Sequence, residues 1–186
     1  FGIDLRTLAV FRIAIAAVLC GDLLERLFHA KIYYTEAGLL PMQAIDQIFG
    51  PAVKWTSLHY HTGANVWMQI AMIGVGLASA ICLLVGYRTK LATVLSWLLF
   101  ISLNRRVSAM CTGGDDLMRL LLFWSIFLPL GARWSVDSGR DSGGKASNDF
   151  CSAATAAILL QVAYMYFFTS IFKAVSPTWQ HGTAVQ

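Results

Sequence analysis

Charged side chains are scarce in this chain: only 13% of its 186 residues are Asp, Glu, Lys or Arg, whereas 57% are hydrophobic. Soluble domains carry about a quarter charged residues, so this composition excludes an ordinary soluble fold. The mean hydropathy of +0.62 points the same way. We therefore expect an integral membrane protein whose length suffices for one bundle of several spans, since each span needs about 20 apolar residues.

Four further features are missing. The basic residues behind the net charge of +4 are scattered singly, so there is no basic stripe and we expect no nucleic-acid partner. Internal repeats and strand patterns are also lacking. Of the four cysteines, Cys20 and Cys82 fall inside expected spans while Cys111 and Cys151 fall on opposite faces of the membrane, which excludes a disulfide framework.

The hydrophobic runs predict an all-α membrane bundle of about five transmembrane helices that forms a single domain over residues 1–186. The expected spans are Thr7 to Phe28, Val66 to Val85, Leu91 to Leu103, Leu117 to Leu130 and Phe150 to Phe172. A short interfacial helix, Met42 to Phe49, follows the first span. Because the chain begins at Phe1 and not at methionine, we expect it to be the N-terminal part of a longer protein.

The connections complete this prediction. Gly86 to Lys90 is a tight turn that makes the second and third spans an antiparallel hairpin, and small residues such as Gly76 and Ala80 in the second span allow a neighbouring helix to approach closely. Asn104 to Asp116 is predicted to be a polar loop. Gly131 to Asp149, rich in Gly and Ser, is predicted to be a flexible exposed loop.

Five spans divide the connections between two sides of the membrane. The N-terminal side carries Arg6, Arg88, Lys90, Arg133, Arg140 and Lys145, whereas the opposite side carries Lys31, Lys54, Arg105, Arg106 and Lys173. The positive-inside rule therefore favours a cytoplasmic N-terminus. We expect the protein in a bacterial inner (plasma) membrane.

Groups capable of chemistry gather on that opposite side: His29, His59, His61, His181, Lys173, Glu36, Asp115 and Asp116. Lys173 closes an aromatic span, and it is either an anchor that reaches toward the headgroups or a base whose pKa an apolar wall lowers. His181 is the candidate catalytic partner of that lysine. His59 and His61 are two residues apart, a spacing that fits a metal site, but interfacial histidines without a metal are the favoured interpretation.

Four further residues are candidates for binding substrate or lipid. Arg12 in the first span is interpreted as a conformation-setting partner of Asp22, with a substrate clamp as the alternative. Arg119 lies four residues after Asp115, so an internal ion pair is predicted between them. Trp179 is predicted to belong to the interfacial aromatic belt that contacts lipid.

Six segments in order resemble a known family. They are Leu8 to Ala14, Tyr33 to Pro41, Leu83 to Ala92, Gly113 to Trp124, Leu128 to Asp137 and Lys173 to Gly182. Together they look like the horizontally transferred transmembrane domain, the family that includes vitamin K-dependent gamma-carboxylase. The resemblance covers nearly the whole chain, and it implies a multi-span helical domain.

The resemblance also implies chemistry. Carboxylase members oxidise a reduced quinone and use the energy to deprotonate and carboxylate glutamate side chains, with a lysine base shortly before a Trp-x-x-Gly sequence. Here Lys173 matches the first lysine of that pair and Ala174 stands at the place of the base. Gly114 and Asp115 stand where the carboxylase has a functional histidine.

Two functions follow as expectations. In the first, the protein is a non-carboxylating structural subunit of a larger membrane complex, which contacts membrane lipids or a quinone and other membrane-protein subunits. In the second, it is a carboxylase-like membrane enzyme that uses Lys173 as a substitute base and binds a quinone between helices. A cleft at Lys173 would indicate the enzyme, whereas flat apolar faces would indicate the subunit.

Overall fold

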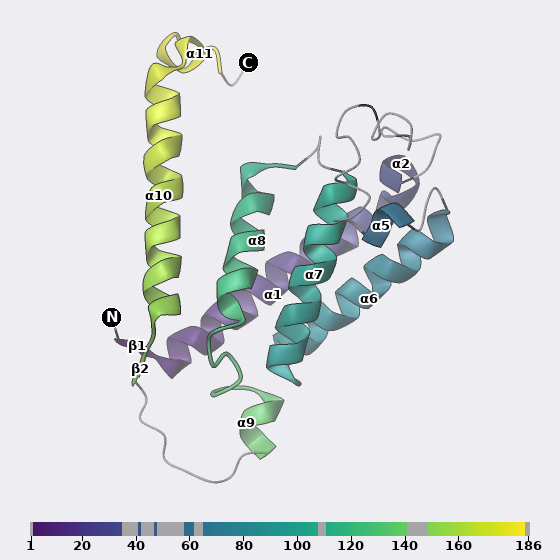
Figure 1. Cartoon of the computed structure of the whole chain (residues 1–186), viewed down its shortest axis with the longest axis vertical. Helices are drawn as coiled ribbons and strands as arrows, with labels where there is room; N and C mark the ends of the chain where they lie inside the picture. The colour runs from purple at the N-terminus through teal and green to yellow at the C-terminus, as the bar shows by residue number, and fades with distance from the viewer. Residues whose placement is uncertain are drawn as a thin grey trace.

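The structure is a computed structural model, and it describes residues 2–34, 41, 47, 58–61, 65–107, 111–140 and 149–184. The expected interfacial helix at Met42 to Phe49 lies largely outside these residues. The described chain is mostly helical, so the all-α expectation holds (Figure 1). One exception is a small antiparallel pair of strands, β1 (Gly2–Asp4) and β2 (Asp149–Cys151), which the sequence did not predict.

Three helices are long and apolar enough to cross a membrane: α1 (Leu5–Phe28), α6 (Val66–Val85) and α10 (Ala153–Val175). The protein is therefore a membrane protein. Two helices at the positions of the other expected spans are less suited to crossing. α7 (Thr89–Arg106) is 18 residues long but includes Lys90, Arg105 and Arg106, and α8 (Gly113–Ser125) is only 13 residues long. The count of five spans is thus not established by these helices.

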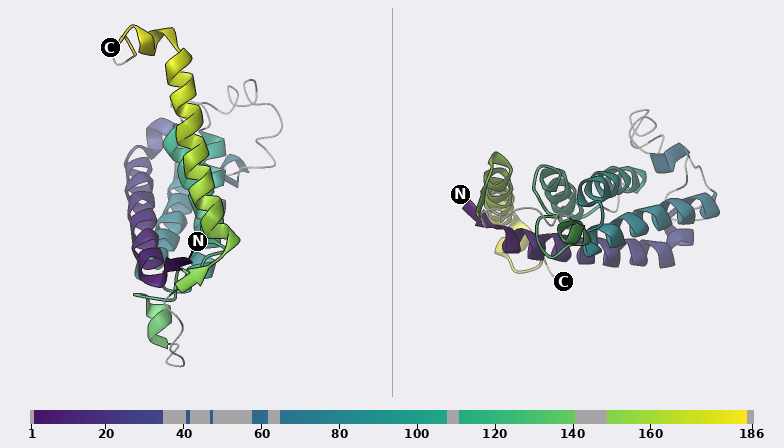
Figure 2. Two further views of the ribbon diagram at one scale, coloured as in Figure 1. Left: turned by 90° about the vertical axis from the view of Figure 1, so that its left-hand side faces the viewer. Right: turned by 90° about the horizontal axis from the view of Figure 1, so that it is seen from below.

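Short helices fill the connections. They are α2 (Ala30–Tyr34), α5 (Leu58–His61), α9 (Val136–Arg140) and α11 (Pro177–Gln180). The two views in Figure 2 place α1 and α6 in one layer and α7 and α8 in a second layer, with α10 at one edge of the bundle. α6 has the predicted bounds and α1 ends at Phe28 as predicted. The other predicted boundaries of the long helices move by a few residues, because capping groups and not hydropathy set those helix ends.

The core lies where α1, α6 and α7 pack on one another. α1 buries a stripe at helical spacing, namely Leu5, Leu8, Ala9, Arg12, Ile15, Ala16, Leu19 and Leu23, and most of it packs on α6. Gly76 of α6 is buried, and a Cβ built there would come within 3.6 Å of Leu23. Ala80 is fully buried as well. The predicted close approach of a neighbouring helix at these small residues is confirmed.

The α6–α7 hairpin is also confirmed. Gly86 ends α6 because it adopts a left-handed conformation with φ of 79°, while its N–H still donates to the carbonyl of Cys82. Farther along the hairpin, the hydroxyl groups of Ser79 and Ser96 lie 3.0 Å apart. These contacts hold α6 and α7 antiparallel.

The segment after α8 differs from the expected flexible loop. Asp137 of α9 accepts hydrogen bonds from the backbone N–H groups of Arg88 and Thr89 at 2.9 and 2.8 Å, and from the Thr89 hydroxyl at 3.0 Å. A carboxylate in this position caps the start of α7. Residues 131–140 are therefore tied to the bundle, whereas residues 141–148 lie outside the described part of the chain.

Candidate functional site

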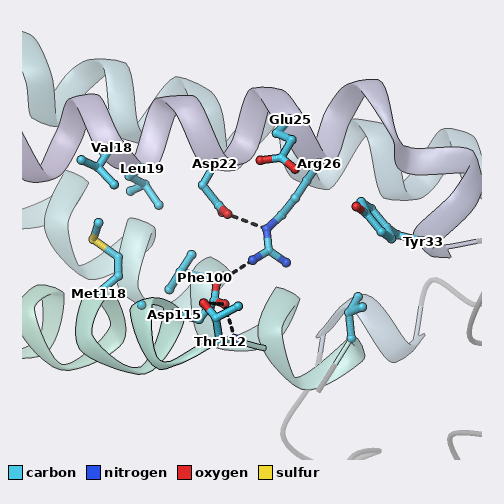
Figure 3. A pocket seen from close by; sticks show the side chains of 12 residues that line it. Val18, Leu19, Asp22, Glu25, Arg26, Tyr33, Phe100, Thr112, Asp115 and Met118 are labelled. Carbon is cyan, nitrogen blue, oxygen red and sulfur yellow. Dashed lines mark hydrogen bonds and ion pairs between the residues drawn. The ribbon is translucent and has the colours of Figure 1, made fainter. Parts of the chain in front are cut away.

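The site with the richest chemistry is a pocket of about 360 Å³ at the ends of α1, α7 and α8 (Figure 3). Its lining comprises Val18, Leu19, Asp22, Glu25, Arg26, Tyr33, Phe100, Val107, Thr112, Gly114, Asp115 and Met118. We call it the α1–α8 pocket. Half of these side chains are charged or polar, which is uncommon inside a membrane bundle and marks a candidate site by itself.

An ion triad crosses the pocket. Arg26 donates through Nε to Asp22 Oδ2 at 2.8 Å and through Nη2 to Asp115 Oδ1 at 2.7 Å, so one guanidinium joins α1 to α8. The side chains of Arg26 and Asp115 are only 14% and 12% exposed. Because these charges are largely removed from water, each depends on the others for its stabilisation.

Asp115 is held from its other side by the start of α8. Its Oδ2 accepts from the backbone N–H of Thr112 at 2.7 Å and from the Thr112 hydroxyl at 2.9 Å, an arrangement that belongs to a capping box. The first turn of α8 therefore fixes the carboxylate before it meets Arg26. This local chemistry also explains why α8 begins at Gly113, four residues earlier than its hydrophobic run predicts.

Two groups beside the pocket are poor acids. Burial raises the pKa of Tyr34 to about 12, although the positive charge of Arg26 opposes the shift. Burial likewise raises the pKa of the Cys111 thiol, and the nearby Asp115 carboxylate adds to this effect. Neither residue is therefore an activated nucleophile or base.

Glu25 is the one carboxylate of the lining that has no ion pair with the described residues. Its side chain is exposed at the rim, next to Arg26 in Figure 3. With Asp22 and Asp115 it gives the lining three carboxylates against one guanidinium, a formal charge of −2. The buried Arg106, directly before the lining residue Val107, adds one positive charge close to the pocket, and the sum of these charges remains negative. The pocket is therefore better suited to a positive charge than to a negative one.

The predicted catalytic pair does not reach this pocket. Lys173 lies in the last turn of α10, and its Nζ lies 4.4 Å from the ring centroid of Trp179. His181 follows α11 and is exposed. Figure 1 shows α11 at the far end of α10, beyond the start of α8. A cation held over an indole face fits the anchoring interpretation of Lys173 and makes Trp179 its partner.

Arg12 has different partners from the predicted Asp22. It is 1% exposed, and its guanidinium donates to the carbonyl of Leu130 at 3.0 Å and to the carbonyl of Trp134. Asp22 pairs with Arg26 instead. Arg12 lies toward the start of α1, away from the α1–α8 pocket, where it satisfies backbone carbonyls of the turn after α8. The interpretation of Arg12 as a residue that sets the conformation therefore fits the structure, but its partners are backbone carbonyls and not Asp22.

The predicted Arg119–Asp115 pair is also wrong. Arg119 Nη2 pairs with Asp116 Oδ1 at 2.9 Å, because Asp115 is already engaged by Arg26 and by Thr112. The Asp116 side chain is 61% exposed, so this pair lies at the surface and contributes little to stability. Asp115 thus enters the candidate site and Arg119 does not.

A metal centre finds no support in the part of the chain that the structure describes, where no group of three or more His, Cys, Asp or Glu residues could hold an ion. His61 is exposed on the short helix α5, and the side chain of His59 lies outside the described residues.

Sequence reasoning missed Asp22, Arg26 and Tyr33 as members of the site. The spacing of Asp22 and Arg26, four residues apart on a helix, was a signal of an ion pair. Thr112 followed three residues later by Asp115 was a signal of a helix start. No pattern in the sequence links Arg26 to Asp115, because 89 positions separate them.

Comparison with known proteins adds no assignment: no family model, curated protein or solved structure matches this chain.

Proposed function

We propose that the protein is a non-carboxylating member of the horizontally transferred transmembrane domain family that serves as a subunit of a larger membrane complex. In this proposal it contacts partner subunits and lipid or quinone through α10. We place it in a bacterial inner membrane with a cytoplasmic N-terminus, in line with the distribution of basic residues. The exposure of α10 is the observation that carries the proposal.

α10 is long enough to cross the membrane, yet only 6% of its most apolar window is buried, against 39% for α1 and 33% for α6. Its exposed side chains include Leu159, Leu160, Tyr164, Tyr166, Phe167, Phe168, Ile171, Phe172 and Val175. Among the described helices it packs mainly on α8 and α11. A span with so few internal contacts needs a surface outside this chain to fix its position.

The aromatic residues of α10 favour a protein surface over lipid alone. Tyr164 and Tyr166 lie near the middle of this 23-residue helix and are 59% and 66% exposed. A tyrosine hydroxyl is favourable at the membrane interface, but near the bilayer centre it needs a hydrogen-bond partner. A neighbouring transmembrane helix supplies one, whereas hydrocarbon does not.

A groove between α8 and α10 supports contact with lipid or quinone. It has a volume of about 620 Å³ and is lined by Leu120, Trp124, Ala157, Leu160, Gln161, Tyr164, Met165 and Phe168. All of these are apolar or aromatic except Gln161. Such a lining suits an acyl chain or a quinone ring.

Two observations support the non-carboxylating part of the proposal. Ala174 stands where the family's carboxylases have their base, and Lys173 lies over the Trp179 ring without a hydrogen-bond or ion-pair partner among the described residues. A lysine acts as a base near neutral pH where an apolar surrounding disfavours its charged form. The Lys173 side chain is exposed at the end of α10, which does not fit that requirement.

Site-specific photocrosslinking tests the proposal. A benzophenone side chain replaces Tyr166 on α10, and the matched control replaces Val75, which is 58% exposed on α6. After illumination of native membranes, we expect the probe at position 166 to capture a partner protein and the probe at 75 to capture mainly lipid. Lipid adducts alone at position 166 would overturn the subunit proposal.

A further inference from the structure

We propose that the α1–α8 pocket binds the ammonium headgroup of an aminophospholipid, with Glu25 as the carboxylate that receives the ammonium group. This inference names the class of lipid for the lipid-contacting part of the proposed function, and it rests on that function only in requiring insertion in a membrane. The pocket lies on a different surface from the exposed face of α10. The two proposals can therefore fail separately.

The depth of the pocket matches the headgroup region. Asp22 lies six residues before Phe28, the end of α1, which corresponds to about 9 Å of helix. Asp115 is in the first turn of α8, and Val107 follows directly after α7. Three helices thus begin or end around the pocket, as expected at the boundary between hydrocarbon and headgroups.

The polarity of the lining changes along one direction. Val18 and Leu19 lie about one turn deeper on α1 than Asp22, and Met118 lies about one turn deeper on α8 than Asp115. In Figure 3 these three apolar residues lie at one end of the pocket, and the ion triad lies next to them toward the other end. An amphiphile has the same succession, with apolar chains below a charged headgroup.

The apolar end of the pocket is open to the side. Val18 is 59% exposed on the outer surface of α1, although it also lines the pocket. Acyl chains can therefore leave the pocket into the surrounding membrane while the headgroup stays inside. A volume of about 360 Å³ is within the range of small-molecule sites and suffices for a headgroup.

The charges select the headgroup. Arg26 is paired with two carboxylates, Asp22 and Asp115, so the negative charge around its guanidinium exceeds its own positive charge and disfavours a phosphate or another anion. Among the residues that the structure describes, Glu25 has no ion-pair partner, and its exposed carboxylate is available at the rim. A primary ammonium group offers three N–H donors to these oxygens, whereas a trimethylated ammonium offers none. Phosphatidylethanolamine is accordingly preferred over phosphatidylcholine and phosphatidylglycerol.

Native mass spectrometry of the full chain in mild detergent tests the inference. The protein is incubated with equal amounts of phosphatidylethanolamine, phosphatidylcholine and phosphatidylglycerol that carry identical acyl chains. We expect phosphatidylethanolamine to be retained most strongly. Glu25→Gln should lower that retention by about two- to fivefold, the range for a partly exposed ion pair. Glu25→Asp should keep most of it.

The matched control is Asp116→Asn, which removes the same charge from a residue close to the pocket that does not line it. This variant should retain phosphatidylethanolamine like the unmodified protein. Equal retention of phosphatidylglycerol, or no effect of Glu25→Gln, would overturn the inference. If the lipid preference is absent but position 166 still crosslinks to a partner protein, the lipid site is refuted and the subunit proposal stands. If the lipid preference is present but position 166 captures no protein, the subunit proposal is refuted and the lipid site stands.

Discussion

Replacing Asp115 by Asn should destabilise the protein much more than replacing its neighbour Asp116 by Asn. Asp115 meets Arg26 at 2.7 Å, and both side chains are largely buried. Breaking a fully buried pair costs about 3–5 kcal/mol, and a surface pair contributes about 0–1 kcal/mol. With residual exposures of 12% and 14%, we expect a loss of about 2 kcal/mol in the free energy of unfolding.

Asp116→Asn is a close control, because both changes remove one negative charge from the first turn of α8. The effect of that charge on the helix dipole, about 0.3–1 kcal/mol, is common to the two variants. Asp116 pairs with Arg119 at the surface, so its own ion pair should add less than about 0.5 kcal/mol. The difference between the variants therefore contains the contact between α1 and α8 together with the two hydrogen bonds from Thr112 to Asp115, and a double-mutant cycle with Arg26 separates these contributions.

Unfolding in mixed micelles with increasing dodecyl sulfate, followed by circular dichroism, measures both free energies. Combining Asp115→Asn with Arg26→Gln in a double-mutant cycle should give a coupling energy of about 1–2 kcal/mol, because the two residues are in direct contact. Equal stabilities for Asp115→Asn and Asp116→Asn, together with a coupling near zero, would refute the reasoning.

Two further predictions concern the ends of the bundle. Gly86→Ala should destabilise the protein by about 1–3 kcal/mol in the same unfolding assay, because φ is 79° there and a new Cβ would lie 2.4 Å from the Cβ of Ser135. Gly74→Ala should be neutral or slightly stabilising, since nothing lies within 4 Å of its added Cβ; a similar loss in both variants would contradict this. Tyr34, with its pKa raised from 10.0 to about 12, should contribute stability that is complete below pH 10 and declines as the pH rises toward 12, because the unfolded chain releases the proton first. Tyr34→Phe should remove that decline, and an unchanged pH profile would argue against a buried hydroxyl.

Long hydrophobic runs in the sequence predicted the positions of the long helices. Val66–Val85 has the predicted limits, since Asn65 caps its start and Gly86 ends it. Both predicted bounds of the fourth expected span are wrong, because local interactions set the ends of this helix. Thr112 and Asp115 start α8 early, whereas Pro129 is incompatible with a helix that continues to Leu130.

The candidate site was predicted only in part. Asp115 was recognised as a polar residue in the right place, but its partner was expected four residues away and is Arg26, on another helix. Side-chain pairs within one helix follow from spacing, whereas pairs between helices depend on their relative depth and rotation. The strands β1 and β2 were missed because three residues are too few to show alternation.

The pairing of these two short strands constrains how the chain crosses the membrane. Gly2 lies opposite Cys151 and Asp4 opposite Asp149, so α1 and α10 start on the same side of the bilayer. A chain that returns to its starting side has crossed an even number of times. With α1 and α6 counted as two crossings, parity among the described helices requires that α7 and α8 either both cross or both remain on one side. With α10 as the last crossing, the parity permits three or five spans in the described helices and forbids four.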